Sequence, residues 1–272
     1  TGTGTSSGRS FTGLGFQPDL IWSSYRTAAG AGAASKPMYD SVRGTAKALF
    51  SDQTSAEASS VVYGYVSSFD SNGWTTTAGS TNNGEYNQLA RDFVGWCWKK
   101  GTTPGFNIVT YTGDGVNGRA IAHGLGATPA MWFVKRRDTT SDWYVAHREA
   151  GFANYQRLNS TDGNVAGGQW FTGATPPNST NFIVGGTGNN VNESGATYVA
   201  YLWSEVSGFS KFGIIYGNSS TDGPSLFCGF KPRWIMIKRI DTTGSWRAYD
   251  TARNSTNPMG ADAYLNTNIA ET

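Results

Sequence analysis

The feature of this sequence that most limits its fold is a long segment that occurs twice. "PAMWFVKRRDTTSDWYVAH" begins at Pro129, and "PRWIMIKRIDTTGSWRAYD" begins at Pro232. Both run from Pro through an apolar stretch to Lys-Arg, Asp-Thr-Thr and a Trp (Trp143 or Trp246), which lies equally far from the Pro in each copy. Because a structural module is repeated within a chain far more often than a catalytic site, this repetition predicts a modular protein.

A third, looser copy precedes these two. "TGLGFQPDLIW" leads into Pro18 as "HGLGATPAMWF" leads into Pro129, and "YDSVRG" near the start matches "YDTARN" near the end. The units close with "FVGWCW" or "YVAYLW". We therefore predict three copies of a module of roughly 100 residues, a length that can bury a core of its own.

The predicted module boundaries are 1–101, 102–206 and 207–272. The first copy starts on a turn and lacks its first strand, while the third stops before any counterpart of "YVAYLW". We expect the sequence to be a fragment of a longer chain. The alternative is a permuted module, in which the first strand of each copy completes the copy before it.

Composition and local pattern predict an all-β fold. Aromatic residues make up 14% of the chain and charged residues only 15%, and 36 glycines supply turns. Short apolar or alternating runs, such as "NIVTY", "AMWFVKR", "DWYVAH", "NFIVG" and "TYVAYLW", are bounded by turn residues, which is the strand signature. "KFGIIY" is the third copy's counterpart of "FNIVTY". The prediction is a row of tandem β-sandwich modules, jelly-roll-like, each with a core of its own.

Charge and hydrophobicity exclude two classes of partner. The formal net charge is +2, without the clustered basic surface of a nucleic-acid-binding protein. No run of 18 apolar residues is present, so we predict no membrane insertion. Cys97 and Cys228 occupy different positions in their modules, which favours small buried side chains and leaves open a long-range disulfide.

Candidate catalytic groups are sparse. Neither of the two histidines lies in a nucleophile or metal motif, so we predict no metal, no cofactor and no enzymatic activity. Four carboxylates are conceivable for glycoside hydrolysis: Asp40, Glu149, Glu205 and Asp250. Asp40 and Asp250 recur at one module position, three residues before an Arg, and this predicts an Asp–Arg pair that fixes a loop.

Aromatic residues divide into two predicted groups. The repeated Trp143 and Trp246 are predicted to pack in the core. Aromatic residues outside the repeat are predicted to lie in loops and to contact a carbohydrate or another receptor: Trp74, Tyr155, Trp170 and Phe171.

The second and third copies resemble a known family. "GFNIVTYTGDGVNGRAIAHGLGATPAMWFVKRRDTTSDWYVAHREAG", "YVAYLWSEVSGFSKFG" and "GFKPRWIMIKRIDTTGSWRAYDTARN" are similar to a repeated domain of tailed-bacteriophage structural proteins. That domain is common in marine and cyanobacterial phages, in predicted tail-fibre and other virion-surface proteins. The family brings no catalytic residues to this sequence. The first copy departs from the pattern at "IWSSYRTAAGAGAAS", where Lys-Arg-x-Asp is absent.

The resemblance implies a virion structural protein on the phage surface, either a tail fibre or another appendage used for host attachment and receptor binding. Expected partners are other virion proteins and a host glycan or envelope protein, with homo-oligomerisation as a trimer. Two alternatives are a decoration or connector protein of the capsid or tail without a receptor, and a virion-associated polysaccharide depolymerase.

Overall fold

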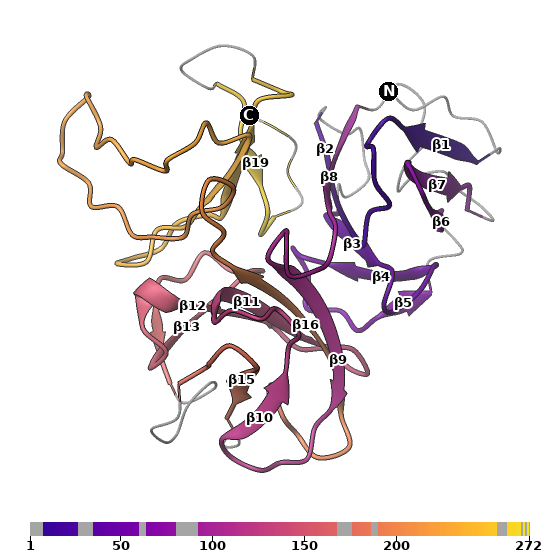
Figure 1. The fold of residues 1–272 in the computed structure, drawn as a ribbon, viewed down its shortest axis with the longest axis horizontal. Helices are drawn as coiled ribbons and strands as arrows, with labels where there is room; N and C mark the ends of the chain where they lie inside the picture. The colour runs from indigo at the N-terminus through magenta and orange to yellow at the C-terminus, as the bar shows by residue number, and fades with distance from the viewer. Residues whose placement is uncertain are drawn as a thin grey trace.

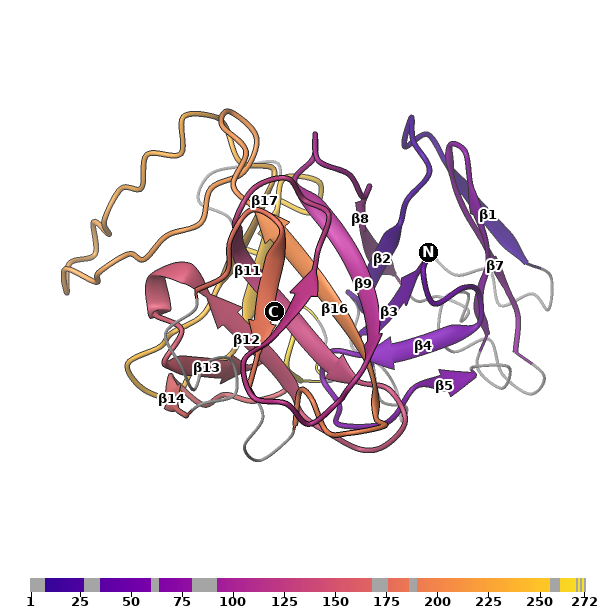
Figure 2. The same ribbon diagram turned by 60° about the horizontal axis from the view of Figure 1, so that its bottom comes forward.

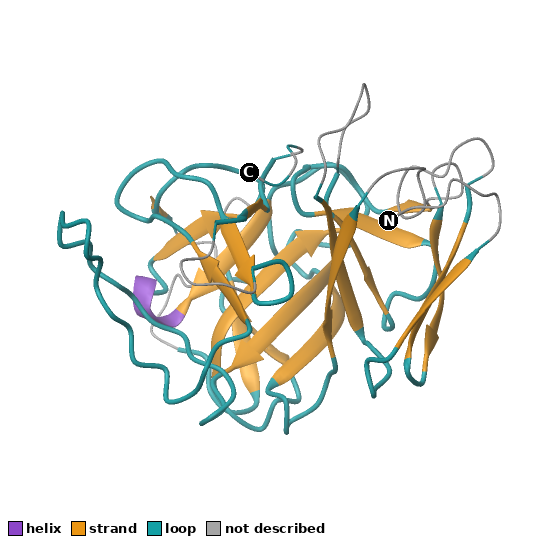
Figure 3. Ribbon diagram, turned by 90° about the horizontal axis from the view of Figure 1, so that it is seen from above, coloured by secondary structure: helices purple, strands orange, loops and turns teal. Residues whose placement is uncertain are grey.

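The protein is all-β, as the sequence predicts. The computed structural model describes residues 8–26, 35–59, 64–79, 92–167, 176–185, 190–254, 260–267, 269 and 271. Within these ranges all the regular structure is strand except for one short 3-10 helix, η1 (Arg148–Ala150) (Figure 3). No helix in the described part of the chain has the length and apolar character needed to cross a membrane. The names modules 1, 2 and 3 denote residues 1–101, 102–206 and 207–272 below.

Module 1 contains two antiparallel sheets. The larger has the order β5-β4-β3-β2-β8, and the smaller has the order β1-β7-β6. Their strands are β1 (Arg9–Thr12), β2 (Leu20–Tyr25), β3 (Pro37–Asp40), β4 (Lys47–Phe50), β5 (Ala58–Ser59), β6 (Tyr65–Asp70), β7 (Gly73–Thr77) and β8 (Phe93–Trp98).

Module 2 repeats this plan with a longer main sheet of order β14-β13-β12-β11-β16-β9 and a second sheet, β10-β15. Its strands are β9 (Phe106–Thr112), β10 (Arg119–Ala122), β11 (Pro129–Arg136), β12 (Trp143–His147), β13 (Asn154–Arg157), β14 (Val165–Ala166), β15 (Asn181–Val184) and β16 (Thr197–Ser204). All five strand runs predicted in this module are present. Figure 2 shows the long strands β9, β16 and β11 side by side.

Module 3 forms one described sheet of order β17-β18-β19, from β17 (Trp234–Ile237), β18 (Arg247–Asp250) and β19 (Ala263–Tyr264). The predicted strand "KFGIIY" is wrong: residues 211–216 are irregular. They belong to the long orange loop at the left of Figure 1. Their counterpart β9 is held by β16, and no described strand of module 3 takes that place, so the segment has no ladder to join.

Two cores lie inside single modules, because strand alternation sends every second side chain to the outer face of each main sheet. In module 1, Ile21, Tyr39 and Trp74 fill the space between the two sheets. In module 2 the corresponding core includes Trp132, Tyr144 and Phe182. Modules 1 and 2 are therefore sandwiches.

The opposite faces of the main sheets meet in a shared core, which joins all three modules. Trp98 of module 1 contacts Trp22 of its own module, Trp203 of module 2 and Trp234 of module 3, with ring centroids 6.4, 6.3 and 5.3 Å apart. In Figure 1 the indigo, magenta and orange-yellow parts of the chain surround this centre. Modules 1 and 2 have the predicted cores of their own, and the shared core is an addition that the prediction did not include; it forms because the opposite faces of the main sheets are also apolar.

Candidate functional site

The repeated tryptophans bind each module to the one before it. Trp143 of module 2 donates a hydrogen bond from Nε1 to the carbonyl of Phe50 in module 1, at 2.8 Å. Trp246 of module 3 makes the same bond, also at 2.8 Å, to the carbonyl of Arg157 in module 2. Both indoles are buried in the shared core, as predicted, but they pack between modules. Each polar N–H is thus satisfied by a neighbouring module.

The Lys of the repeated Lys-Arg makes a second bond of this kind. Lys135 Nζ lies 2.9 Å from the carbonyl of Thr54 in module 1, and Lys238 Nζ lies 3.1 Å from the carbonyl of Thr161 in module 2. Burial lowers the pKa of each ammonium to about 8. We call the Lys and Trp of one copy the latch, formed by Lys135 and Trp143 or by Lys238 and Trp246.

The third interface, between modules 1 and 3, uses different residues. Lys36 of module 1 occupies the place of Trp143: the backbone N–H of each donates to the Oδ1 atom of the side chain 16 residues further on, Asp52 or Asn159. Lys36 Nζ donates to the carbonyl of Ile269 in module 3 at 2.8 Å. Arg26 adds an ion pair with Glu271, at 2.8 Å. Module 1 therefore departs from the repeat at the interface that it forms with module 3.

A second set of contacts joins the last strand of one module to the main sheet of another module. Tyr201 on β16 donates from its hydroxyl to Asp40 Oδ2 in module 1, at 2.7 Å. Trp96 occupies the same place on β8, since it lies opposite Trp22 as Tyr201 lies opposite Phe133. Its Nε1 donates to Asp250 Oδ2 in module 3, at 3.0 Å.

The predicted Asp–Arg pairs are present and fix the loop after β3 and β18. Asp40 Oδ2 accepts from Arg43 Nε at 2.5 Å, and Asp250 Oδ2 accepts from Arg253 Nε at 2.6 Å. In each loop the other carboxylate oxygen accepts two backbone N–H groups, including that of the Arg itself. Both carboxylates are fully engaged in holding structure.

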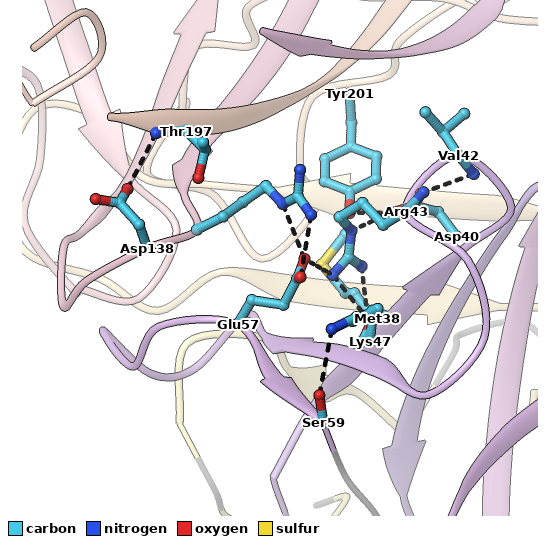
Figure 4. A network of polar contacts seen from close by, with 11 residues as sticks. Met38, Asp40, Val42, Arg43, Lys47, Glu57, Ser59, Asp138, Thr197 and Tyr201 are labelled. Atoms are coloured by element: carbon cyan, nitrogen blue, oxygen red, sulfur yellow. Dashed lines mark hydrogen bonds and ion pairs between the residues drawn. The ribbon is translucent and has the colours of Figure 1, made fainter. Parts of the chain in front are cut away.

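Around Asp40 the contacts extend into a network that crosses from module 1 to module 2 (Figure 4). Arg43 is completely buried and also pairs with Glu57 at 3.1 Å. Glu57 accepts two hydrogen bonds from Arg137 of module 2, at 2.9 and 3.0 Å. Burial acts to raise the pKa of Glu57, but the hydrogen bonds from Arg137 and the charge of Arg43 outweigh it and hold the pKa below its ordinary value.

This depressed pKa predicts acid sensitivity. The unfolded chain takes up a proton at Glu57 more readily than the folded one, so the stabilisation is complete above the ordinary value of 4.5 and is lost as the pH falls through the folded value. The urea midpoint is expected to fall between about pH 5 and pH 3. Glu57→Gln is expected to flatten that dependence, while Asp222→Asn, at an exposed position, leaves it unchanged. An equally steep dependence in Glu57→Gln would contradict the assignment.

The other carboxylates weighed for hydrolysis are also tied to a cation. Arg148 bonds to Glu149 at 2.8 Å and to Glu205 at 3.2 Å, and Lys211 holds the second oxygen of Glu205. Among the described residues, no group of three or more His, Cys, Asp and Glu side chains could hold a metal ion. These acids therefore serve as partners in ion pairs between segments of the chain.

The aromatic residues predicted to contact a receptor are not gathered into one place. Trp74 lies on β7 and Tyr155 on β13, so the expectation that they lie in loops is wrong; their side chains are 8% and 7% exposed. The indole of Trp74 stacks on Phe11 and covers Gly95, where a Cβ would lie 3.3 Å from the ring. Burial of both rings argues against stacking on a sugar at these two positions. Trp170 and Phe171 lie outside the described residues, and their contact role stays a prediction.

Both cysteines are free thiols, so the disulfide that the sequence left open is absent. Burial raises the pKa of Cys97 to about 12, which keeps this thiol protonated at neutral pH.

Sequence reasoning missed the contacts between modules. Lys36 and Tyr201 carry no motif that marks them. The signal that could have found the latch is the repetition of Lys and Trp together in modules 2 and 3, because an interface that recurs needs the same donors twice.

Comparison with known proteins gives one positive result. A family model described as a domain of unknown function (DUF7483) matches residues 1–272. The search of curated proteins found no match, and neither did the search of solved structures.

Proposed function

We propose that this chain, which belongs to the DUF7483 family over residues 1–272, is a structural protein of a bacteriophage virion. Its role is that of a fibre or surface appendage that mediates attachment to the host. The resemblance of modules 2 and 3 to repeated domains of phage virion proteins supports the virion location. The proposed partners are other virion proteins and a host glycan or envelope protein.

The observation that carries a structural role is the latch. Lys135 and Trp143 donate hydrogen bonds to module 1. Lys238 and Trp246 donate hydrogen bonds to module 2 in the same way. The most distinctive repeated segment therefore serves to join modules. A body whose parts share one core resists bending between modules, which suits a spacer or an adhesive tip on a particle surface. The four carboxylates weighed for hydrolysis are all engaged in ion pairs, which favours this role over hydrolysis.

The experiment that tests the proposal is a glycan array and host-cell binding assay, run beside a reducing-sugar assay on host polysaccharide. We expect binding without release of reducing ends. Release of reducing ends would identify a depolymerase, and neither binding nor release in any assay would identify a connector. Either result would overturn the proposed adhesive role.

A matched pair of variants tests the predicted contact residues. The Trp170→Ala, Phe171→Ala double variant is expected to lose host binding with an unchanged melting temperature. Trp74→Ala is the control, since its buried ring supports the module 1 core and its loss is expected to lower the melting temperature. Unchanged binding in the double variant would remove these residues from the receptor site.

A further inference from the structure

His123 fastens the second sheet of module 2 to its main sheet. It directly follows β10 and is buried, with 1% of its surface exposed. Its backbone N–H donates to the carbonyl of Thr180, in the loop before β15, at 3.0 Å. Its carbonyl accepts from Asn107 Nδ2 on β9, at 2.8 Å. One residue therefore connects both ends of the second sheet with the edge strand of the main sheet.

Both ring nitrogens of His123 also have hydrogen-bond partners, and the two nitrogens have opposite roles. Nδ1 accepts the backbone N–H of Leu125 at 3.1 Å, so it carries no proton. The neutral ring then holds its proton on Nε2, which donates to the carbonyl of Asn178 at 3.0 Å. Only the neutral ring, in this one tautomer, can make both bonds. We call the bonds of His123 the clasp.

Protonation of His123 is incompatible with the clasp. A proton on Nδ1 would point at the N–H of Leu125, which is 2% exposed, so that N–H would be left buried without an acceptor. The side chains bonded to His123 or next to its ring bonds are Asn107, Leu125 and Asn178, and none of them carries a charge. Burial lowers the pKa of His123, and no charged side chain of the described residues adds to this shift.

The second sheet of module 2 is small and depends on such contacts. Among the described residues, β10 and β15 pair only with each other, over four residue pairs. A sheet of two strands is marginally stable unless it packs on other structure. Its side chains Ile121 and Phe182 belong to the core of module 2. In Figure 1 the two strands lie at the bottom, on the side of the main sheet away from modules 1 and 3.

Module 1 makes the same joint without a histidine. There Asn72, in the turn before β7, accepts the backbone N–H of Leu14 at its carbonyl, at 3.4 Å, and that of Gly15 at Oδ1, at 2.6 Å. Leu14 is the counterpart of Leu125 in the repeated Gly-Leu-Gly turn. Both histidines of the sequence lie in module 2, so a joint that titrates near neutral pH is particular to that module.

We propose that His123 is an acid-sensitive switch, whose protonation opens the clasp and releases the β10–β15 sheet from the core of module 2. The three modules stay joined, because the latch and the shared core lie on the other face of the main sheet. The released ring binds a proton more readily than the clasped ring. The clasp is therefore fully stabilising above the ordinary pKa of 6.5 and weakens as the pH falls through the lower pKa of the folded state. This inference does not rest on the proposed virion role.

The test is hydrogen exchange of the full chain at about pH 7.5 and about pH 5.5, with protection corrected for the intrinsic exchange rate. At the lower pH, about one unit below the ordinary histidine pKa, protection of the β10 and β15 amides is expected to fall by about three- to tenfold. Protection of β1 and β7, at the joint of module 1, is expected to stay unchanged, as is that of β12 in the shared core. Nitrogen NMR is expected to show the ring proton of His123 on Nε2 at neutral pH.

Two variants assign the effect to one histidine. His123→Asn does not titrate, and its side chain can accept the N–H two residues on, as Asn178 Oδ1 accepts that of Thr180 at 2.9 Å. It is expected to show the same protection of β10 and β15 at both pH values. His147→Asn replaces the other histidine of the sequence and is the matched control, expected to respond to acid as the parent does.

Four results would overturn the proposal. They are a ring proton on Nδ1 at neutral pH, protection of β10 and β15 that does not change with pH, an equal loss of protection in β1 and β7, and a His123→Asn variant that responds to acid as the parent does. If His123→Asn does not fold, the ring NMR and the comparison of β10 with β1 in the parent chain still decide.

Discussion

Trp143→Ala is expected to lower the free energy of unfolding by about 3–5 kcal/mol, the usual cost of removing a buried aromatic side chain. The indole lies in the shared core and stacks on Tyr201 with the ring centroids 6.1 Å apart. Its loss also removes the indole N–H bond to the Phe50 carbonyl of module 1, which retains the backbone N–H of Gln53 as a donor. Urea unfolding of parent and variant measures the difference.

The location of the destabilised segments distinguishes a latch residue from an ordinary core residue. Hydrogen exchange in Trp143→Ala is expected to rise in β4 of module 1 as well as in β12. Trp143→Phe is the control: it keeps an apolar ring and loses the hydrogen bond, so a loss of about 1–2 kcal/mol is expected. If exchange in module 1 stayed at the parent rate, the tryptophan would serve module 2 alone.

Arg43→Ala is the second change expected to have a large effect, with a loss of about 3–5 kcal/mol. Arg43 and Asp40 are fully buried, and Arg43 also donates to the carbonyls of Met38 and Lys47. Removal of the guanidinium leaves the carboxylate of Asp40 buried without its counter-charge, and Glu57 loses one of its two cations. Breaking a buried pair from one side is costly for this reason.

Arg239→Ala is the matched control for this prediction. Arg239 pairs with Asp241 on the exposed surface, so its removal is expected to leave the urea midpoint unchanged. The double variant Asp40→Asn, Arg43→Ala removes both charges and is expected to recover part of the loss. Equal stability of Arg43→Ala and the parent would show that the network contributes nothing to the fold.

The sequence was sufficient to predict the all-β class, the strand runs of module 2 and the Asp–Arg loops. These features are local: alternation and turn residues act within a few positions, and Asp40 and Arg43 are three residues apart. The burial of Trp143 and Trp246 also followed from their place in a repeat.

The packing of the modules on one another could not be predicted in this way. Apolar runs on both faces of β11 are compatible with a sandwich alone or with a sandwich whose outer face meets another module. Lys36 occupies the position at which modules 2 and 3 have Trp. Because the residue types differ, the sequence does not reveal that the three positions are equivalent. The irregular course of residues 211–216 depends on pairing with a strand far away in the sequence, which local pattern does not contain.

Hydrogen exchange in increasing urea tests the shared core most directly, because it reports each module separately. If the three modules are one cooperative body, the core-facing strands β2, β12 and β18 lose protection at the same urea concentration, and Trp143→Ala shifts all three together. Loss of protection at three separate concentrations, with only β12 shifted by the variant, would contradict it.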